Sequence, residues 1–162
     1  LIQLLHNLPV ASLNFTQTGT SANDTLFGNS GDDVIDAGAG NNIIYAAEGN
    51  NILYGGAGND IIKTSARDDL IYAGEGNNTI STGIGNDTIY VGSGSTRFIL
   101  DAGVESVTIY AYSGDDSISR GSTLAANSLL SVSISGNDTL VSAGSDLLAT
   151  LKSTPLNSVN II

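Results

Sequence analysis

Asp and Asn side chains recur at a spacing of nine residues along much of this 162-residue chain. In nine-residue units counted from Gly19, the sixth residue is Asp or Asn in eight consecutive units. The chain also has 16 acidic residues against 5 basic ones, which gives a net charge of −11. Such an acidic chain suits a protein that collects cations, because hard cations prefer oxygen ligands. The sixth-position residues are Asp24, Asp33, Asn42, Asn51, Asp60, Asp69, Asn78 and Asp87.

The residues that must position these oxygens follow the same period. Nine units run without insertion from Gly19 to Ile99; the eighth residue is always large and apolar, and the fourth is Gly in seven of the nine. The apolar residue predicts a very short strand with one inward side chain, and the glycines predict a turn. Two units therefore form one turn of a flattened coil. Residues 18 apart then lie above one another at the strand spacing of ~4.7 Å.

This pattern resembles the RTX (repeats-in-toxin) family, whose nonapeptide G-G-x-G-x-D-x-U-x folds as a parallel β-roll with calcium in its turns. GGAGNDIIK (55–63) fits the pattern fully, and GNSGDDVID (28–36) lacks only the second glycine. The resemblance implies an all-β fold: a parallel β-roll (β-solenoid) with two repeats per turn and an irregular β flank on its C-terminal side. It also implies calcium ions as cofactors.

The ligand set comes from the same resemblance. It assigns side-chain ligation to the eight sixth-position residues and carbonyl ligation to the glycines of the loops. Those glycines are Gly31, Gly40, Gly49, Gly58, Gly76 and Gly85.

Seven sites arise when stacked neighbours are paired, and they differ in charge. Only Asp69 with Asp87 supplies two carboxylates, five sites mix one Asp with one Asn, and Asn78 with Thr96 has no carboxylate. Since ligand charge tunes affinity, we expect most sites to be weak and the roll to be partly folded without calcium. The alternative is an Asn-rich solenoid that needs no ion and is held by amide ladders.

The segments outside the nine repeats are expected to close or extend the roll. We assign residues 1–18 to an apolar N-terminal cap or docking segment, 19–99 to the roll, and 100–162 to a C-terminal β flank or cap. This flank contains a degenerate repeat at 111–119, in which Asp116 is a candidate isolated ligand. Uncovered solenoid ends pair readily with other chains.

Tyrosines recur at the outward ninth position on one side of the expected roll. Tyr54, Tyr72 and Tyr90 are 18 residues apart, so they should stack as a ladder. An apolar stripe on a surface often marks a contact site. Self-association is therefore expected either through this tyrosine face or through the chain ends.

Several functional classes are disfavoured. The acidity argues against nucleic acid, whose phosphates need Lys and Arg, and no apolar run approaches the roughly 18 residues of a membrane span. His6 is the sole histidine, and neither a nucleophile elbow nor a phosphate loop with its lysine occurs. We therefore expect no catalytic site.

Three functions remain open. The first is a secreted, non-enzymatic, extracellular structural or surface-assembly protein, such as a part of a fibre, coat or adhesin. The second is the C-terminal calcium-dependent export and folding module of a larger type I-secreted toxin or hydrolase, with a parent catalytic or adhesin domain elsewhere. The third is an ice- or ligand-binding solenoid. The resemblance places the protein outside the cell or on the surface of a Gram-negative-type bacterium.

Overall fold

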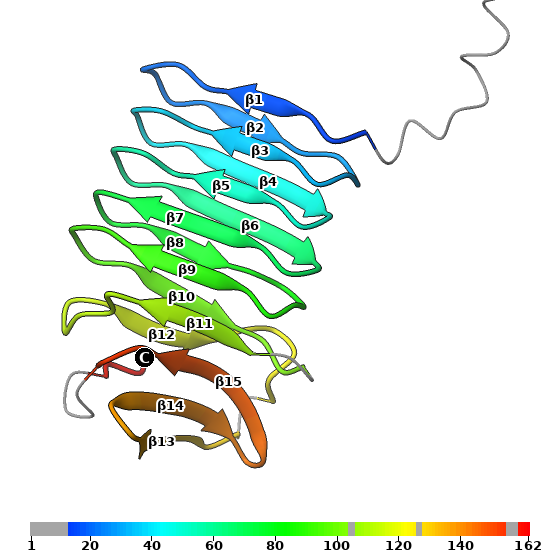
Figure 1. The fold of residues 1–162 in the computed structure, drawn as a ribbon. Coiled ribbons are helices and arrows are strands. Elements are labelled where there is room, and N and C mark those ends of the chain that lie inside the picture. Colours follow the sequence, from blue (N-terminus) through cyan, green and yellow to red (C-terminus); the bar gives the residue numbers. More distant parts are fainter. Residues whose placement is uncertain (1–12, 104–105, 126–127, 155–158) are drawn as a thin grey trace, which may run out of the picture.

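The computed structural model of the chain shows a flattened coil of stacked turns (Figure 1). It describes residues 13–103, 106–125, 128–154 and 159–162. Every helix or strand element in these ranges is a β-strand, and no helix there is suited to cross a membrane. Consecutive strands from β1 to β12 alternate between two sheets on opposite sides of the coil, so that two repeats make one turn.

The larger sheet has nine strands. Its pairing is parallel from β1 through β11 and on to β15, and β15, β14 and β13 then pair antiparallel. In spatial order the strands are β1 (Thr16–Thr18), β3 (Val34–Asp36), β5 (Ile52–Tyr54), β7 (Leu70–Gly74), β9 (Thr88–Val91), β11 (Val107–Tyr110), β15 (Asp146–Leu151), β14 (Asp138–Ala143) and β13 (Leu130–Ser135).

The smaller sheet has six strands, all parallel. Ile44 pairs with Ile62 in this sheet, and Leu53 pairs with Ile71 in the other, so stacked residues are 18 apart. The predicted parallel β-roll with two repeats per turn is therefore confirmed. The strands are β2 (Thr25–Phe27), β4 (Ile43–Glu48), β6 (Ile61–Ala66), β8 (Thr79–Ser81), β10 (Arg97–Leu100) and β12 (Ser117–Arg120).

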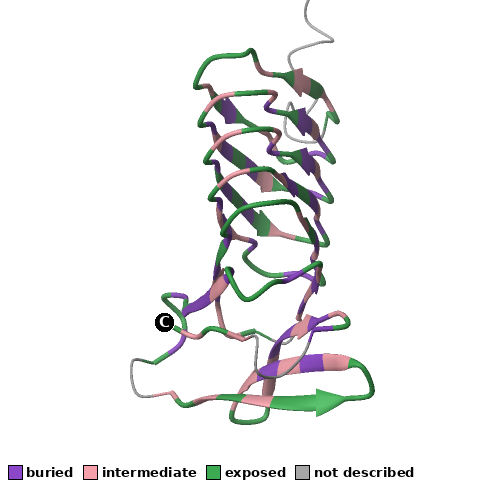
Figure 2. Ribbon diagram, turned by 90° about the vertical axis from the view of Figure 1, so that its left-hand side faces the viewer, coloured by how far each residue is buried: buried purple, intermediate pink, exposed green. Residues whose placement is uncertain are grey.

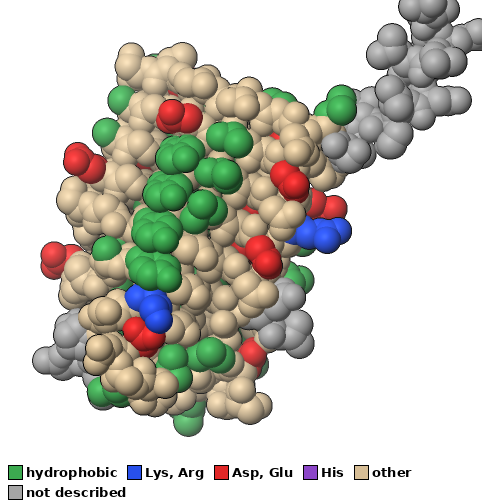
Figure 3. Space-filling view, in the orientation of Figure 1, with side chains coloured by type: hydrophobic (Ala, Val, Ile, Leu, Met, Phe, Trp, Pro, Cys, Tyr) green, Lys and Arg blue, Asp and Glu red, His purple; other side chains and the backbone are tan. Residues whose placement is uncertain are grey.

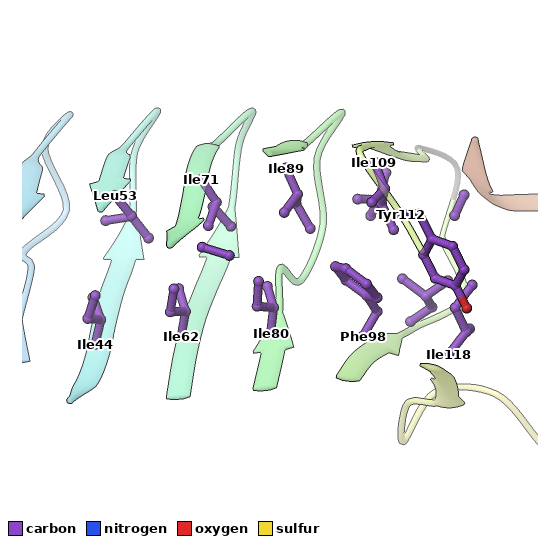
Figure 4. Close-up of a cluster of buried hydrophobic side chains, with 14 of the residues drawn as sticks. Ile44, Leu53, Ile62, Ile71, Ile80, Ile89, Phe98, Ile109, Tyr112 and Ile118 are labelled. Atoms are coloured by element: carbon purple, nitrogen blue, oxygen red, sulfur yellow. The ribbon is translucent and has the colours of Figure 1, made fainter. Parts of the chain in front are cut away.

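Along the nine repeats the core is built mainly from the eighth residue of each repeat. Leu53 and Ile71 lie in one row and Ile44 and Ile62 in the facing row, all fully buried (Figure 4). Burying one such side chain stabilises the fold by about 1.5–3 kcal/mol. A single repeat cannot bury its own apolar residue, so this stabilisation is available only when turns stack.

The stacking continues beyond the nine repeats on both sides. β1 pairs with β3 and aligns Gln17 with Ile35. On the other side Ile109 pairs with Ile89, 20 residues away, and Ile118 is likewise 20 residues from its partner Phe98. Two additional residues thus break the sequence period, while the core rows continue. Residues 1–12 of the expected N-terminal cap lie outside the described residues.

Past β12, the strands of the C-terminal flank extend only the larger sheet. The antiparallel strands β15, β14 and β13 follow β11, while the smaller sheet ends at β12 with an isolated bridge between Ile118 and Ile161. β13 is the most exposed of the three (Figure 2). The roll therefore has two facing sheets along the repeats, but only the larger sheet continues through β15, β14 and β13.

Two loop positions require a left-handed backbone. Gly56, at the second position, has a φ of 90°, and a Cβ there would lie 1.7 Å from the carbonyl oxygen of Gly38 on the turn before. Glycine alone permits both the φ and the close approach. The fourth position is also left-handed, as at Gly58 with a φ of 125°. Ala47 at a second position and Arg67 at a fourth position adopt φ values of 64° and 88° despite their Cβ atoms.

We predict a graded response to alanine at three glycines. Gly114→Ala should be nearly neutral, because its φ is not left-handed and a Cβ would meet nothing within 4 Å. Gly136→Ala adds only a left-handed φ of 64°, at a cost of about 1 kcal/mol. Gly56→Ala combines the φ with the clash and should cost about 3 kcal/mol or more. Chemical denaturation measures all three. Equal losses for Gly56→Ala and Gly136→Ala would contradict the close stacking.

Arg67 offers the converse test. Arg67→Gly should raise the free energy of unfolding by about 1 kcal/mol, because it removes the Cβ from a left-handed backbone. Arg67→Ala is the control: it removes the charged side chain but keeps the Cβ, so it should give no such gain. Thermal melting of the three proteins checks this, and equal stabilisation by Ala and Gly would assign the effect to charge instead.

Candidate metal centre

The sixth-position side chains lie inside the loops that lead into the strands. All eight directly precede a strand that starts at the seventh position and carries a buried eighth residue, such as Asp60 before β6 and Asp69 before β7. Asp24 is half-buried. The others are at most 2 % exposed: Asp33, Asn42, Asn51, Asp60, Asp69, Asn78 and Asp87. The structure thus places all eight predicted ligands in equivalent positions along two edges of the roll.

In all of these side chains except Asp24, the Oδ1 atom joins successive turns. The backbone N–H of Asp33 donates to Oδ1 of Asn51 at 2.9 Å, that of Asn51 to Oδ1 of Asp69 at 2.8 Å, and that of Asp69 to Oδ1 of Asp87 at 2.9 Å. The other edge repeats the pattern from Asp24 to Asn78. Asp and Asn both carry Oδ1, so this ladder is the same for either residue.

The second terminal atom distinguishes Asn from Asp. Nδ2 of Asn42 donates to the carbonyl of Gly40 at 3.2 Å, and Nδ2 of Asn51 donates to the carbonyl of Gly49 at 3.0 Å. These are two of the carbonyls that the family resemblance assigns to calcium. At both loops an amide N–H of the protein is therefore already bonded to that oxygen.

The carboxylates fall into two groups. Oδ2 of Asp24 accepts from the backbone N–H and hydroxyl of Thr20, and Oδ2 of Asp33 accepts from the N–H of Asn29. Oδ2 of Asp60 and Oδ2 of Asp69 are buried and accept no hydrogen bond. A buried carboxylate oxygen without a donor is costly unless a cation compensates it. Because their Oδ2 atoms have no protein donor, Asp60 and Asp69 are better suited than Asp24 and Asp33 to bind a hard cation.

Comparison with known protein families identifies the repeats that contain these loops. The RTX calcium-binding nonapeptide repeat model matches four times, at residues 18–53, 38–65, 63–97 and 99–122, which together span well over half of the chain. The chain belongs to the RTX calcium-binding nonapeptide repeat family. It is thus a calcium-binding β-roll, and the fourth match includes the turn formed by β11 and β12.

One solved structure that matches this chain is the solution structure of the AlgE6R3 subunit from the Azotobacter vinelandii mannuronan C5-epimerase. It shares 20 % identity with this chain, with a TM-score of 0.33, and the match covers 95 % of this chain and 81 % of that one. No curated protein matches. The family assignment rests on the repeat match.

The electrostatics of the RTX loops also favour Asp60 and Asp69 as cation ligands. Burial raises the pKa of Asp69 to about 6, hydrogen bonds from Asn51 to its Oδ1 lower it, and the charge of Asp87 raises it. The Thr64 hydroxyl, which lies near Asp69, donates its hydrogen to the carbonyl of Thr82. Burial also raises the pKa of Asp60. Both carboxylates therefore lack compensating charge, which a bound calcium ion would supply.

Ligands for such an ion must come mainly from neutral oxygens. In the described ranges no three Asp, Glu, His or Cys side chains converge on one point. The fourth-position carbonyls are directed along the roll, as that of Gly58 is toward Gly76 and that of Gly40 toward Gly58. Carbonyl and amide oxygens with one or two carboxylates suit calcium, which accepts six to eight oxygen ligands.

Asp116 differs from the other candidate ligands. It is fully buried, and its Oδ1 accepts from the backbone N–H of Thr96 at 2.7 Å. Its Oδ2 accepts from the N–H and hydroxyl of Ser113. Protein donors therefore bind both oxygens, and in this structure Asp116 organises the loop before β12.

A second ladder of hydrogen bonds, at the fifth position, was not predicted from the sequence. At the fifth position the direction is reversed: Oδ1 of Asn41 accepts from the N–H of Asn59, and Oδ1 of Asp32 accepts from that of Asn50. The signal was the recurrence of Asn and Asp at this position. Its role becomes visible only when the 18-residue stack aligns each side chain with the next loop.

We predict a characteristic pH dependence without calcium. The pKa of Asp69 rises from an ordinary 3.8 to about 6 on folding, so between these values the folded chain binds more protons than the unfolded chain. Stability should therefore fall as the pH rises from about 4 to about 6, with Asp69 contributing about 2 kcal/mol. The measurement is urea unfolding in EGTA across this range for wild type and Asp69→Asn. The variant should lose that part of the slope, and identical curves would contradict the assignment.

Proposed function

We propose that this RTX chain is a non-enzymatic extracellular protein, stabilised by calcium and used as a structural or surface-assembly part of a bacterial fibre, coat or adhesin. The observation that supports it is the buried, hydrogen-bond-free Oδ2 of Asp60 and of Asp69 inside family-type loops. A cation that binds these oxygens only in the folded chain stabilises it by mass action.

Calcium-dependent folding is consistent with secretion. Reduced-charge oxygen sites bind calcium in the 10⁻⁴–10⁻³ M range typical of extracellular modules. In a cytosol with little calcium the uncompensated carboxylates disfavour the roll, and outside the cell the ion favours it. The 16 acidic and 5 basic residues add general self-repulsion, which calcium also relieves.

A construction role is favoured over rapid calcium switching. The Asn loops are bonded internally through Nδ2, so part of the roll needs no ion. Hydrophobic side chains gather in a stripe along the roll axis (Figure 3). The rings of Tyr54, Tyr72, Tyr90 and Tyr110 stack along it with centroids 4.8–5.2 Å apart. A durable roll with a regular aromatic stripe suits an assembled surface layer.

The second candidate is the C-terminal export and folding module of a larger secreted toxin or hydrolase. The observation in its favour is the antiparallel flank β13–β15, which extends one sheet past the last turn, as the irregular flank of such modules is expected to do. The complete reading frame distinguishes the two: a catalytic domain in the same frame supports the module, and its absence supports the structural role.

We predict that calcium in the millimolar range raises the melting temperature by several degrees, since a filled weak site is worth about 1–3 kcal/mol. Asp69→Asn should reduce this gain, because it keeps Oδ1 for the N–H of Asn51 but removes the charge. The matched control is Asp68→Asn, which neutralises the adjacent, exposed carboxylate and keeps its bond from the N–H of Asn86.

Scanning calorimetry with calcium, with magnesium and with EGTA provides the readout. The control should keep the full calcium shift, and magnesium should give a smaller one because it demands stricter geometry. A melting temperature that is the same in calcium and in EGTA would contradict the proposed function. Equal losses in the two variants would contradict the assignment of Asp69 as a ligand.

A further inference from the structure

β13 is an unprotected edge of the nine-stranded sheet. It pairs with β14 on one side and is the terminal strand of that sheet. Its six residues, Leu130–Ser135, include no charge and no proline. Soluble proteins usually protect edge strands by charge, proline or very short length. The edge strands β1 and β2 have three residues each, and β12 ends in Arg120. Among the described edge strands, β13 is therefore the one that is both long and without charge.

The apolar face of β13 is also only partly covered. Leu130, Val132 and Ile134 alternate with serines and continue the inward face of the sheet, because Val132 pairs with the fully buried Val141 of β14. The smaller sheet ends at β12 and does not reach this level. Ile134 is consequently 59 % exposed, while Leu130 and Val132 are half-buried.

The free backbone groups lie on the same residues. In an antiparallel pair, hydrogen bonds to the partner alternate along the strand. The two-residue loop Gly136–Asn137 joins β13 to β14, and the residues that flank such a loop form a hydrogen-bonded pair. The outward N–H and C=O groups of β13 therefore belong to Leu130, Val132 and Ile134.

The sequence of this strand is symmetric about Val132. Leu130–Ser131–Val132–Ser133–Ile134 has the same order of apolar and serine residues in both directions. Across a two-fold axis perpendicular to the sheet, Val132 would face Val132 of a second copy and Leu130 would face Ile134. The apolar residues of both copies then share one face, and the outward backbone groups meet. A second copy thus fits this edge better than an unrelated strand.

We propose that β13 pairs antiparallel with β13 of a second copy, centred on Val132, and joins the two nine-stranded sheets into one. The pairing gives a closed, isologous dimer. It brings together strands without charge, which matters for chains that each carry −11. This inference deepens the assembly role proposed above, but it requires neither calcium nor the tyrosine stripe.

A charge exchange at the centre of the pairing tests it. Val132→Lys and Val132→Glu each place two like charges opposite one another, so each variant should sediment as a monomer where the wild-type chain forms a dimer. An equimolar mixture should recover a Lys/Glu heterodimer. Sedimentation velocity over a range of concentrations, in calcium and in EGTA, provides the measurement, with circular dichroism melting as the check of folding.

A second pair of variants decides the matter if Val132 substitutions impair folding. Ile134→Lys should weaken dimerisation at least tenfold. Ile84→Lys should leave it unchanged, since Ile84 has the same 59 % exposure but lies in a loop of the roll. A monomeric wild-type chain, or a dimer that persists in Ile134→Lys, would overturn the inference. A dimer without a calcium effect on melting would leave it standing and contradict only the calcium-stabilised function.

Discussion

A hydrogen bond from a backbone N–H to the Oδ1 atom of a side chain 18 residues further on joins the turns of this roll. At the sixth position it runs, for example, from Asn51 to Asp69 and from Asn42 to Asp60. It fixes the loop that precedes each strand and thereby the direction of the buried eighth residue. Because Asp and Asn supply the same oxygen, the backbone is indifferent to which of them is present.

The choice between Asp and Asn therefore controls charge without altering the fold. Where Asn51 stands, its amide N–H bonds the carbonyl of Gly49, and the loop is satisfied by the protein alone. Where Asp60 or Asp69 stands, a buried oxygen remains without a donor, and burial raises the pKa of the carboxyl. Under the proposed function, this mixture gives a roll whose folding depends on calcium only in part, as suits a durable extracellular protein.

The nine-residue period predicts the main architecture because each repeat meets the same neighbours. The inward row of Leu53 and Ile71, the 18-residue register and the stacking of Tyr54 on Tyr72 all follow from it. It could not predict that Tyr110 continues the tyrosine ladder. Two additional residues break the period there, and only backbone pairing shows that the stack goes on.

The details of the candidate sites depend on local donors that a repeat pattern does not specify. Asp116 matches the sixth position of a degenerate repeat, yet Ser113 and the backbone of Thr96 bind its carboxylate. Asp24 and Asp69 look alike in sequence, but Thr20 donates to Oδ2 of Asp24 alone. The antiparallel flank has no repeat at all, so its pairing with β11 came from the structure.

The central claim is that calcium binds where a buried carboxylate oxygen has no protein donor. The most direct measurement is a crystal structure grown in calcium, with the ions located by anomalous scattering. We expect calcium peaks beside Oδ2 of Asp60 and of Asp69, and none at the carbonyls of Gly40 and Gly49 that Asn42 and Asn51 already bond. Empty Asp loops at saturating calcium, or ions in the Asn loops with those amides displaced, would contradict the account.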